Sequence, residues 1–519
     1  MPTAASSHRH IGESIEMHKS HRLAEYLEVL AFHFGLAEEW SKALDYHLAA
    51  GRRAQSVYAN EAAVHHFREA IKAAERVTGS EARQLLAHEG LGDVLDTLGN
   101  YDEALEHLYQ ALALVMVVSS SAEEMTRRLA DLCCKTASIH EKKSNYDTAF
   151  NWLRGGLIAM EDLTAVEVAR IYLRGAAVHY KQGKNGEAIE WCHKGLDMAQ
   201  KVVGHEGQAA IAHADYLLGL IHNRLGNMAR TIEYCQKSLE IYEQIQDIAG
   251  AAQAHINLGN GYFDQGDWPK ATEHYLRALE IKRKIGDVYY QAVIALNLGG
   301  VYLNQGDLDQ ALSYYRQSLK MWQTLGSTYA IALLHNNMGT VALHRGNLDE
   351  ALSLLQQSQE MFEQIKSIDF MPEVYRHLAE AHLERGELDT AQAHARNSLT
   401  MAQEQKMRLE EGATRRVLGQ VHRGLHELAQ AEQEVEQSLR ILEELNSRYE
   451  IGKTFFQLAL LRRDQGRGAE AEAALERAIT IFRELGAQRD LQEAESHQKT
   501  GIVPSHQKTG IISSLQLSS

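Results

Sequence analysis

The sequence feature that most constrains the fold is a pattern that returns every 40 residues. A glycine followed by a polar or charged residue recurs in the same context at Gly226, Gly266, Gly306, Gly346, Gly386 and Gly466. The last two glycines are 80 residues apart, and His426 fills the position between them. Upstream, the pattern reappears at less regular spacing at Gly99, Ser144 and Gly183. Repeats of about 20–50 residues are typical of solenoids, in which each repeat packs only against its neighbours.

Each repeat carries small residues at three fixed places around this glycine. In the repeat centred on Gly266 they are Gly259, Ala271 and Ala278, and the large Tyr275 stands between the last two. Small residues let two helix backbones approach closely, and a large side chain fills the space beside them. The code therefore predicts a pair of packed helices in every repeat, here named helix A and helix B.

Capping residues indicate where these helices begin and end. Helix A is expected to start near a side chain that accepts from free N–H groups, at Asp247, Asp287, Ser327, Ser367 and Ser447. Helix B is expected to open at Asp267, Asp307 and Asn347, and to close at Gly286 and Gly326. Pro269 falls in a first helical turn, where its missing N–H costs little.

These motifs resemble the tetratricopeptide repeat (TPR) family, whose repeats carry W-x2-L-G-x2-Y and then A-x3-F. The segment Leu258-Gly259-Asn-Gly-Tyr262, followed by Ala271-x3-Tyr275 and Ala278, is a close match. The 40-residue period, in place of about 34, looks like the long-helix subclass of regulators of heterotrimeric G proteins and of bacterial and archaeal regulators. The resemblance implies an all-α fold, a right-handed α-solenoid of antiparallel helix pairs.

The chain is expected to divide into four parts. An amino-terminal segment spans 1–18, and a region of atypical TPR-like helices spans 19–78. About ten TPR units follow over 79–490, with the 40-residue period holding from about residue 207. The tail, 491–519, contains the motif Ser-His-Gln-Lys-Thr-Gly-Ile twice and is expected to lack helical order.

The amino-terminal part resembles the helical stretch that follows the nucleotide-binding module of large signalling ATPases, including those fused to class III adenylate or guanylate cyclases. The residues that carry this resemblance are His8–Glu16, Arg22-Leu-Ala-Glu-Tyr26, Leu30-Ala-Phe-His-Phe34 and Trp40–Gly51. It implies a second reading beside a free-standing scaffold, in which the chain is the regulatory TPR half of an ATPase or cyclase whose catalytic modules are absent from it.

Composition excludes several other classes. The net charge of −16 argues against nucleic acid and anionic membrane partners. The sequence has no apolar run long enough to span a bilayer and no signal peptide at its start. Its four cysteines form no CxxC spacing. A cytoplasmic protein without cofactor or metal is expected, and self-association is possible.

Three strings that suggest chemistry have simpler explanations. Gly452-Lys453-Thr454 is the end of a Walker A loop, but it falls inside a predicted helix A, where the phosphate cradle cannot form. His65 and His66 are adjacent and so point in different directions on a helix. Cys133-Cys134 is expected to be a pair of core or near-core residues. No enzymatic activity is predicted.

A ligand of a TPR solenoid is expected on the concave wall, which the A helices line. The groove positions there give Asn257, Asn297 and Asn337, with Asn260 beside the first. An amide both donates and accepts, so this ladder would bind the backbone of an extended peptide or partner helix. The alternative is that the asparagines bond a neighbouring helix and stiffen the stack.

The same positions supply other candidates for the peptide-binding groove. The polar flanking residues are Asn223, Arg224, Arg376, Arg416 and Arg423, and the apolar residues are Ile256, Phe263, Leu296, Leu303 and Leu343. The arginines would suit an acidic peptide, since guanidinium groups pair bidentately with carboxylates. The alternative is that many of them pair with glutamates of the chain itself.

Overall fold

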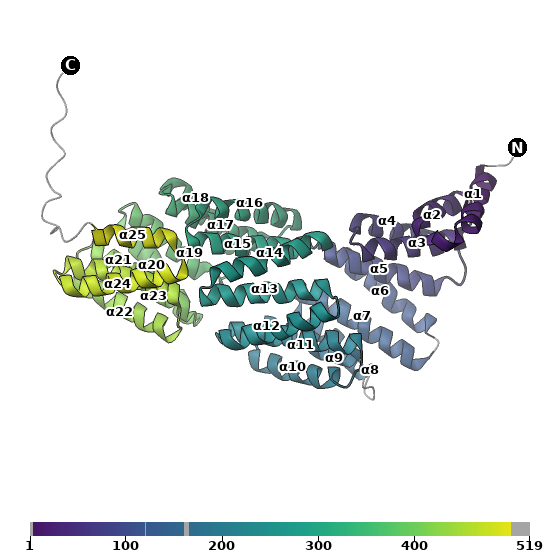
Figure 1. Cartoon of the computed structure of the whole chain (residues 1–519), viewed down its shortest axis with the longest axis horizontal. Helices are drawn as coiled ribbons and strands as arrows, with labels where there is room; N and C mark the ends of the chain where they lie inside the picture. Colours follow the sequence, from purple (N-terminus) through teal and green to yellow (C-terminus); the bar gives the residue numbers. More distant parts are fainter. Residues whose placement is uncertain (1–3, 120, 160–165, 500–519) are drawn as a thin grey trace, which may run out of the picture. The chain divides into compact units, whose positions relative to one another are not determined.

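The computed structural model describes residues 4–119, 121–159 and 166–499, and the chain separates there into two compact units (Figure 1). The first unit comprises 1–258 and 276–291, and the second comprises 259–275 and 292–519. Over the described residues, the chain forms α-helices and one 3-10 helix and has no strand. Helices that lie wholly in the first unit are α1 (Ala4–His18), η1 (Ser20–Glu25), α2 (Leu27–Leu36), α3 (Trp40–Ser56), α4 (Asn60–Ala74), α5 (Glu81–Leu98), α6 (Tyr101–Val118), α7 (Ala122–Lys142), α8 (Tyr146–Ala159), α9 (Val166–Lys181), α10 (Asn185–Ala199), α11 (His205–Arg224) and α12 (Met228–Gln244).

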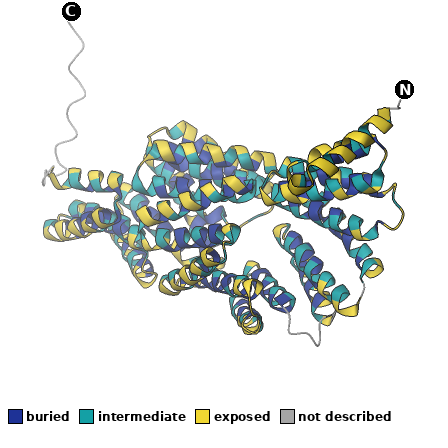
Figure 2. Cartoon of the chain, turned by 45° about the vertical axis from the view of Figure 1, so that its right-hand side comes forward, coloured by how far each residue is buried: buried dark blue, intermediate teal, exposed yellow. Residues whose placement is uncertain are grey.

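Three helices contribute residues to both units. They are α13 (Ile248–Gln265), α14 (Trp268–Ile285) and α15 (Val288–Gln305). The second unit continues with α16 (Leu308–Leu325), α17 (Thr328–His344), α18 (Leu348–Gln364), α19 (Met371–Glu384), α20 (Leu388–Glu404), α21 (Arg408–Gly424), α22 (Leu428–Glu444), α23 (Arg448–Asp464), α24 (Gly468–Leu485) and α25 (Gln488–Lys499). Consecutive helices pack in pairs, such as α5 with α6 and α21 with α22, so the predicted all-α solenoid of helix pairs is confirmed. Most helices are buried along one face and exposed along the other (Figure 2).

The small-residue code works as predicted at the A–B contact. A Cβ atom on Gly259 would lie 2.5 Å from the ring of Tyr275, and one on Gly299 would lie 2.4 Å from the ring of Tyr315. Both rings are almost completely buried. A tyrosine of helix B thus occupies the space that glycine leaves on helix A, and any larger residue at the glycine would displace it.

Serine at the third small position adds a bond that the sequence pattern did not suggest. Ser318 and Ser358 donate to the carbonyl oxygens of Ala292 and Ala332, each 26 residues earlier and at 2.8 Å. Ser238 and Ser398 make the same bond at 2.7 Å. A buried hydroxyl of this kind contributes about 1 kcal/mol, and it ties the middle of helix B to the start of helix A in the same repeat.

Most of the predicted caps are confirmed. Asp247 and Ser327 accept from the backbone N–H groups of Gly250 and Ala330, at 2.9 and 3.3 Å. Gly286 and Gly326 follow helices with φ of +74° and +70°. Asn347 and Ser447 precede their helices as expected but make no capping bond through the side chain.

The cap predicted at Ser367 is wrong, because α19 begins at Met371 with Pro372 in its first turn. Proline has no N–H to donate to the carbonyl of residue 368, so the helix cannot start three residues earlier. The predicted tail, from residue 491, also begins too early, because α25 runs to Lys499 and contains the start of the first Ser-His-Gln-Lys copy. The second copy lies outside the described residues.

Three histidine pairs join helices of the first unit, α1 with α2, α3 with α4 and α5 with α6. The Nδ1 atoms are 2.8 Å apart in His8–His33, 3.1 Å in His47–His66 and 2.9 Å in His88–His107. Each pair shares one proton, because one ring must donate and the other accept. Burial, followed by the partner's charge, lowers the pKa of His47 and of His88 to about 4. The His47–His66 and His88–His107 pairs are therefore neutral at pH 7.

Each unit is also closed by a contact between distant repeats. In the first unit, the side chain of Asn60 donates to the carbonyl of Ile285 at 3.1 Å. In the second unit, the edge of Trp268 meets the ring of Tyr449, with centroids 5.3 Å apart. Leu485 packs on the turn at Gly266, where an added Cβ would lie 2.3 Å from it.

Candidate functional site

Two of the three predicted groove asparagines bond to the preceding A helix. Asn257 is 3% exposed and donates to the carbonyl of Tyr216 at 3.5 Å. Asn297 donates to the side-chain oxygen of Asn260 at 3.2 Å, and the side chain of Asn337 accepts from its neighbour on α17 at 3.4 Å. These bonds match the alternative in which the asparagines stiffen the stack. Contact with a ligand stays a prediction.

The predicted apolar groove residues differ in exposure. Ile256 and Leu343 are buried, whereas Phe263, Leu296 and Leu303 are half-buried. The first two already pack inside the protein. Only the last three have surface left for a ligand.

At the end of α11, Arg224 and Asn223 contact other parts of the first unit. The guanidinium of Arg224 lies 3.6 Å from the ring centroid of Tyr180 and also donates to its carbonyl. The side chain of Asn223 donates to the sulfur of Met228 at 3.7 Å. Arg224 remains exposed on its outer side.

The three arginines predicted to attract an acidic peptide all have carboxylate partners within the second unit. These ion pairs are Arg376–Glu410, Arg416–Glu450 and Arg423–Asp464. Arg376 also meets Glu380 at 3.2 Å. The pairs match the alternative in which the arginines serve the fold, and acidic-peptide binding stays a prediction.

The first unit contains a cavity of about 540 Å³ that these predictions did not include. Helices α5, α7, α9, α11 and α13, all in the helix A position of successive repeats, supply most of its wall. The remainder comes from the starts of α6, α8 and α15 and from Tyr242 of α12. The wall is rich in tyrosine, with Tyr101, Tyr180, Tyr216, Tyr242, Tyr289 and Tyr290.

Most charged groups in this wall are already paired, although Lys181 makes no ion pair within the described residues. Lys142 meets Asp96 at 2.7 Å, and Arg174 meets Glu141 at 3.2 Å. The two pairs connect α7 with α5 and with α9, so they also fix the A helices relative to one another. The cavity therefore presents compensated charge instead of a single sign.

A second pocket of about 300 Å³ adjoins the cavity and shares part of its wall. The shared residues are Asp96, Ser138, Arg174 and His213. At its far end Lys135 contacts Glu89 at 2.6 Å and Asp93 at 2.9 Å. Burial raises the pKa of Asp93 to about 6 in spite of this lysine.

His213 stands where the two pockets meet. Burial, and then the charges of Arg174 and Arg170, lower the pKa of its ring to about 3. Its ring is neutral at pH 7 and contacts Tyr216, with centroids 5.9 Å apart. A neutral imidazole there has one donor and one acceptor to offer.

The strings that suggest chemistry lie in ordinary helical surroundings. Lys453 is inside α23 and pairs with Glu450 at 2.7 Å. Cys133 and Cys134 lie on α7, and burial raises the pKa of these thiols to about 11 and about 12, so neither is a thiolate. Within the described residues, no group of three or more His, Cys, Asp or Glu side chains is placed to hold a metal ion.

The cavity was not predicted from the sequence, because the candidate groove residues came mainly from the regular 40-residue repeats and the cavity lies mostly in the irregular ones. One signal was present, since Tyr180 lies four residues after the small Ala176, at a predicted groove position. Tyr289 and Tyr290 had no such signal, because they reach the cavity from the start of α15 through the long-range closure at Asn60.

Comparison with known proteins places the chain in a family. Tetratricopeptide repeat models match residues 60–116, 168–209, 210–284, 290–364 and 370–444. These matches together span more than half of the sequence, and the chain belongs to the tetratricopeptide repeat family. No curated protein sequence matches it.

Solved structures with the same fold include a Rap protein complexed with competence and sporulation factor, at a TM-score of 0.55 and 16% identity. That match covers 71% of this chain and 100% of the Rap chain. A STAND protein with a tetratricopeptide repeat sensor from Pyrococcus horikoshii gives a TM-score of 0.48 at 17% identity, over 74% of this chain and 56% of that one. At these identities the likeness concerns the fold alone.

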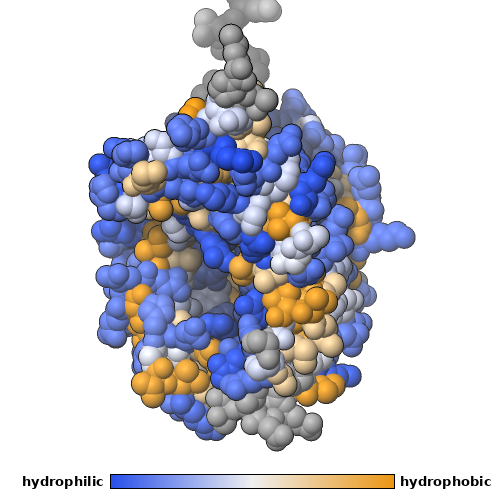
Figure 3. All heavy atoms as spheres, turned by 90° about the vertical axis from the view of Figure 1, so that its right-hand side faces the viewer, coloured by the Kyte–Doolittle hydropathy of each residue, from blue (hydrophilic) through white to orange (hydrophobic). Residues whose placement is uncertain are grey.

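No helix among the described residues is long and apolar enough to cross a membrane. The face of the molecule in Figure 3 is largely hydrophilic, with hydrophobic residues in small scattered groups.

Proposed function

We propose that the chain is a non-enzymatic interaction scaffold that binds a peptide or a partner helix against its A helices. The observation that carries this proposal is the cavity of the first unit, whose wall comes mostly from the A helices of five successive repeats. Its volume of about 540 Å³ lies in the range of ligand pockets. The Rap protein of similar fold, bound to competence and sporulation factor, supports the same use of the fold.

The contents of the cavity favour binding over catalysis. Two ion pairs, Lys142–Asp96 and Arg174–Glu141, engage most of its charged groups, and the raised pKa of Cys134 leaves no thiolate nucleophile in the adjoining pocket. Aromatic rings with polar tips are the side chains that bind peptides with little loss of conformational entropy.

Filling the cavity should abolish capture of partners. Ala249 lies in the wall at the start of α13, and Ala249→Trp would place an indole in the space that a ligand needs. We expect at least a tenfold loss of partner capture in a pull-down with the full chain, with little change in thermal stability. Ala122→Trp, at the exposed first residue of α7, is the matched control. Equal capture by both variants would refute a role for the cavity.

The asparagine ladder has its own test. The variant Asn257→Ala/Asn297→Ala/Asn337→Ala should reduce capture about tenfold if the side chains bind a peptide backbone, as a loss of about 1.4 kcal/mol implies. Asn151→Ala, at an exposed position on α8, is the control. A lowered melting temperature with unchanged capture would assign the asparagines to the stack alone.

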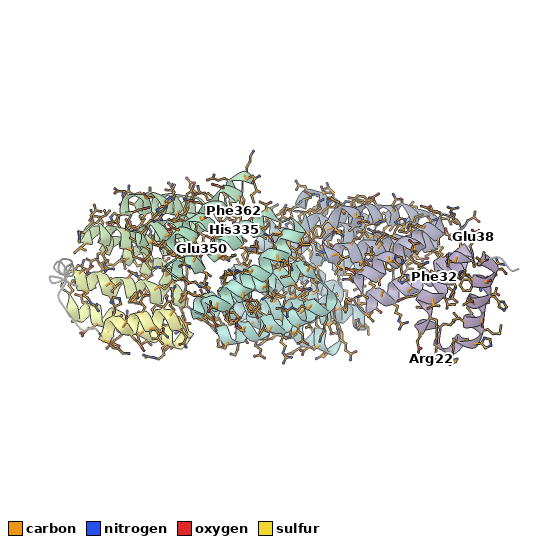
Figure 4. All side chains as sticks on the ribbon, turned by 90° about the horizontal axis from the view of Figure 1, so that it is seen from above. Arg22, Phe32, Glu38, His335, Glu350 and Phe362 are labelled. Atoms are coloured by element: carbon orange, nitrogen blue, oxygen red, sulfur yellow. The ribbon has the colours of Figure 1, made fainter. Side chains whose placement is uncertain are left out.

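A second candidate is the regulatory half of a signalling ATPase or cyclase. What favours it is an apolar stripe on α2, where Val29, Phe32 and Leu36 are 42%, 58% and 47% exposed (Phe32 is labelled in Figure 4). Exposed stripes with helical spacing are typical of surfaces that another domain covers. An in-frame P-loop ATPase in the DNA directly upstream of Met1 would favour this candidate, and its absence would oppose it.

A further inference from the structure

The cavity of the first unit leaves specific groups for a ligand, and these groups define what it can bind. The closure that connects Asn60 with Ile285 holds the start of α15 in place, so Tyr289 and Tyr290 face the cavity together with residues of α9 and α11. Rings from several helices therefore surround whatever enters. A space of this size accommodates a short chain segment and excludes a folded domain.

The polar groups of the wall divide into two sets. Most of the charged groups are paired, with Lys142 on Asp96, Arg174 on Glu141 and Lys135 on acidic neighbours at the far end. The exposed Lys181 is the exception, since it makes no ion pair within the described residues. A charged ligand group would have to break one of these pairs, or remain next to a charge of its own sign. Both outcomes cost free energy in a partly desolvated site.

The second set is neutral and unengaged. Among the described residues, the hydroxyl groups of Tyr216, Tyr242 and Tyr290 make no hydrogen bond. Burial raises the pKa of all three, so each hydroxyl stays protonated and both donates and accepts. The neutral ring of His213 adds a donor and an acceptor between the two pockets.

Neutral donors and acceptors set among aromatic faces are complementary to peptide amides that carry apolar side chains. We propose that this cavity binds a short peptide segment without charged side chains, whose backbone amides bond the hydroxyls of Tyr216 and Tyr290 and whose aromatic or aliphatic side chains contact the tyrosine rings. This inference rests on the proposed scaffold function and differs from the acidic peptide that the arginines of the second unit predict.

The test uses the full chain and three pools of random hexapeptides with acetylated and amidated ends. One pool contains only uncharged residues, the second carries one fixed Glu and the third one fixed Lys. Affinity selection with mass spectrometry should enrich aromatic and aliphatic members of the uncharged pool. The affinity of the best peptide should change less than twofold between 50 and 500 mM NaCl, since no counterions are released.

Tyr216→Phe/Tyr290→Phe removes two oxygen atoms and leaves the rings, so it should weaken that peptide about tenfold without lowering the melting temperature. Tyr302→Phe/Tyr314→Phe, a stacked pair in the second unit, is the matched control and should bind as the unsubstituted chain does. Enrichment confined to the Glu or Lys pool, or of no pool at all, would overturn the proposal.

One further comparison separates this inference from the proposed function. A peptide that Ala249→Trp loses but the double tyrosine variant keeps would overturn the hydroxyl chemistry and leave the cavity as the binding site. If Ala249→Trp also keeps every peptide and every partner, both proposals fail.

Discussion

Lowering the pH from 7.5 to 5 should destabilise the folded chain by several kcal/mol. Burial, the largest cause for each ring, lowers the pKa of His213 and of His344 to about 3, against about 6.5 for an unfolded histidine. The folded pKa is the lower one, so the unfolded chain binds more protons between pH 6.5 and 3. The stabilisation from these neutral rings is complete above pH 6.5 and falls as the pH decreases. At pH 5 the contribution of each ring to the free energy of unfolding is about 2 kcal/mol smaller than at pH 7.5.

His47 and His88 also destabilise the fold as the pH falls. Each shares one proton with its partner histidine, and a second proton would leave the pair without an acceptor and break the hydrogen bond. Asp93, Asp215 and Glu373 oppose them, because burial raises the pKa of these carboxyls to about 6, about 6 and about 7. A carboxyl with a raised pKa stabilises the fold as the pH falls, so these three groups offset part of the loss. The histidines are more numerous and dominate the sum.

Urea unfolding followed by circular dichroism at pH 7.5, 6 and 5 measures this effect. His213→Gln and His344→Gln should flatten the pH dependence, whereas substitution of the exposed His10 should leave it unchanged. A midpoint that stays constant from pH 7.5 to 5 would contradict the expectation.

The second large effect is expected at a buried ion pair in the second unit. Arg416 is 3% exposed and pairs with Glu450 of the next A helix. Burial alone would raise the pKa of Glu450, but the charges of Arg416 and Lys453 hold it well below its usual value. Arg416→Ala leaves this carboxylate without its main partner and should cost about 3–5 kcal/mol.

Two comparisons identify the cause. Arg345→Ala removes an ion pair whose partner Asp309 is exposed, and it should cost less than about 1 kcal/mol. Arg416→Met/Glu450→Met/Lys453→Met removes all three charges of this cluster, since Lys453 also pairs with Glu450, and it should be more stable than Arg416→Ala because none of the three is left without its partner. Denaturant unfolding of the three variants decides this, and equal losses for Arg416→Ala and Arg345→Ala would contradict it.

The fold was predictable because the residues that determine each helix pair are close together in the sequence of its own repeat. Gly259 and Tyr275, 16 residues apart, define the A–B contact, and Asp247 or Ser327 mark where a helix starts. The cap at Ser367 was mispredicted because Pro372, directly after the expected first turn, has no N–H to donate to the carbonyl of residue 368.

The site was less predictable, for two physical reasons. The groove positions were assigned from one helix at a time, but the partners of Asn257 and Arg376 lie on neighbouring A helices. Part of the cavity wall, Tyr289 and Tyr290, follows Ile285, whose carbonyl accepts from Asn60, 225 residues earlier. No local pattern contains that separation.

The contact of Trp268 with Tyr449 has a consequence for how this array can change in length. An open solenoid can gain or lose whole repeats, since each repeat needs only its neighbours. In the second unit, the ring of Trp268 and the turn at Gly266 meet residues of α23 and α24, which come five repeats later. Deleting one 40-residue repeat between them would keep every local contact but move Tyr449 and Leu485 away from their partners. The contact can therefore form only when a fixed number of repeats separates its two partners.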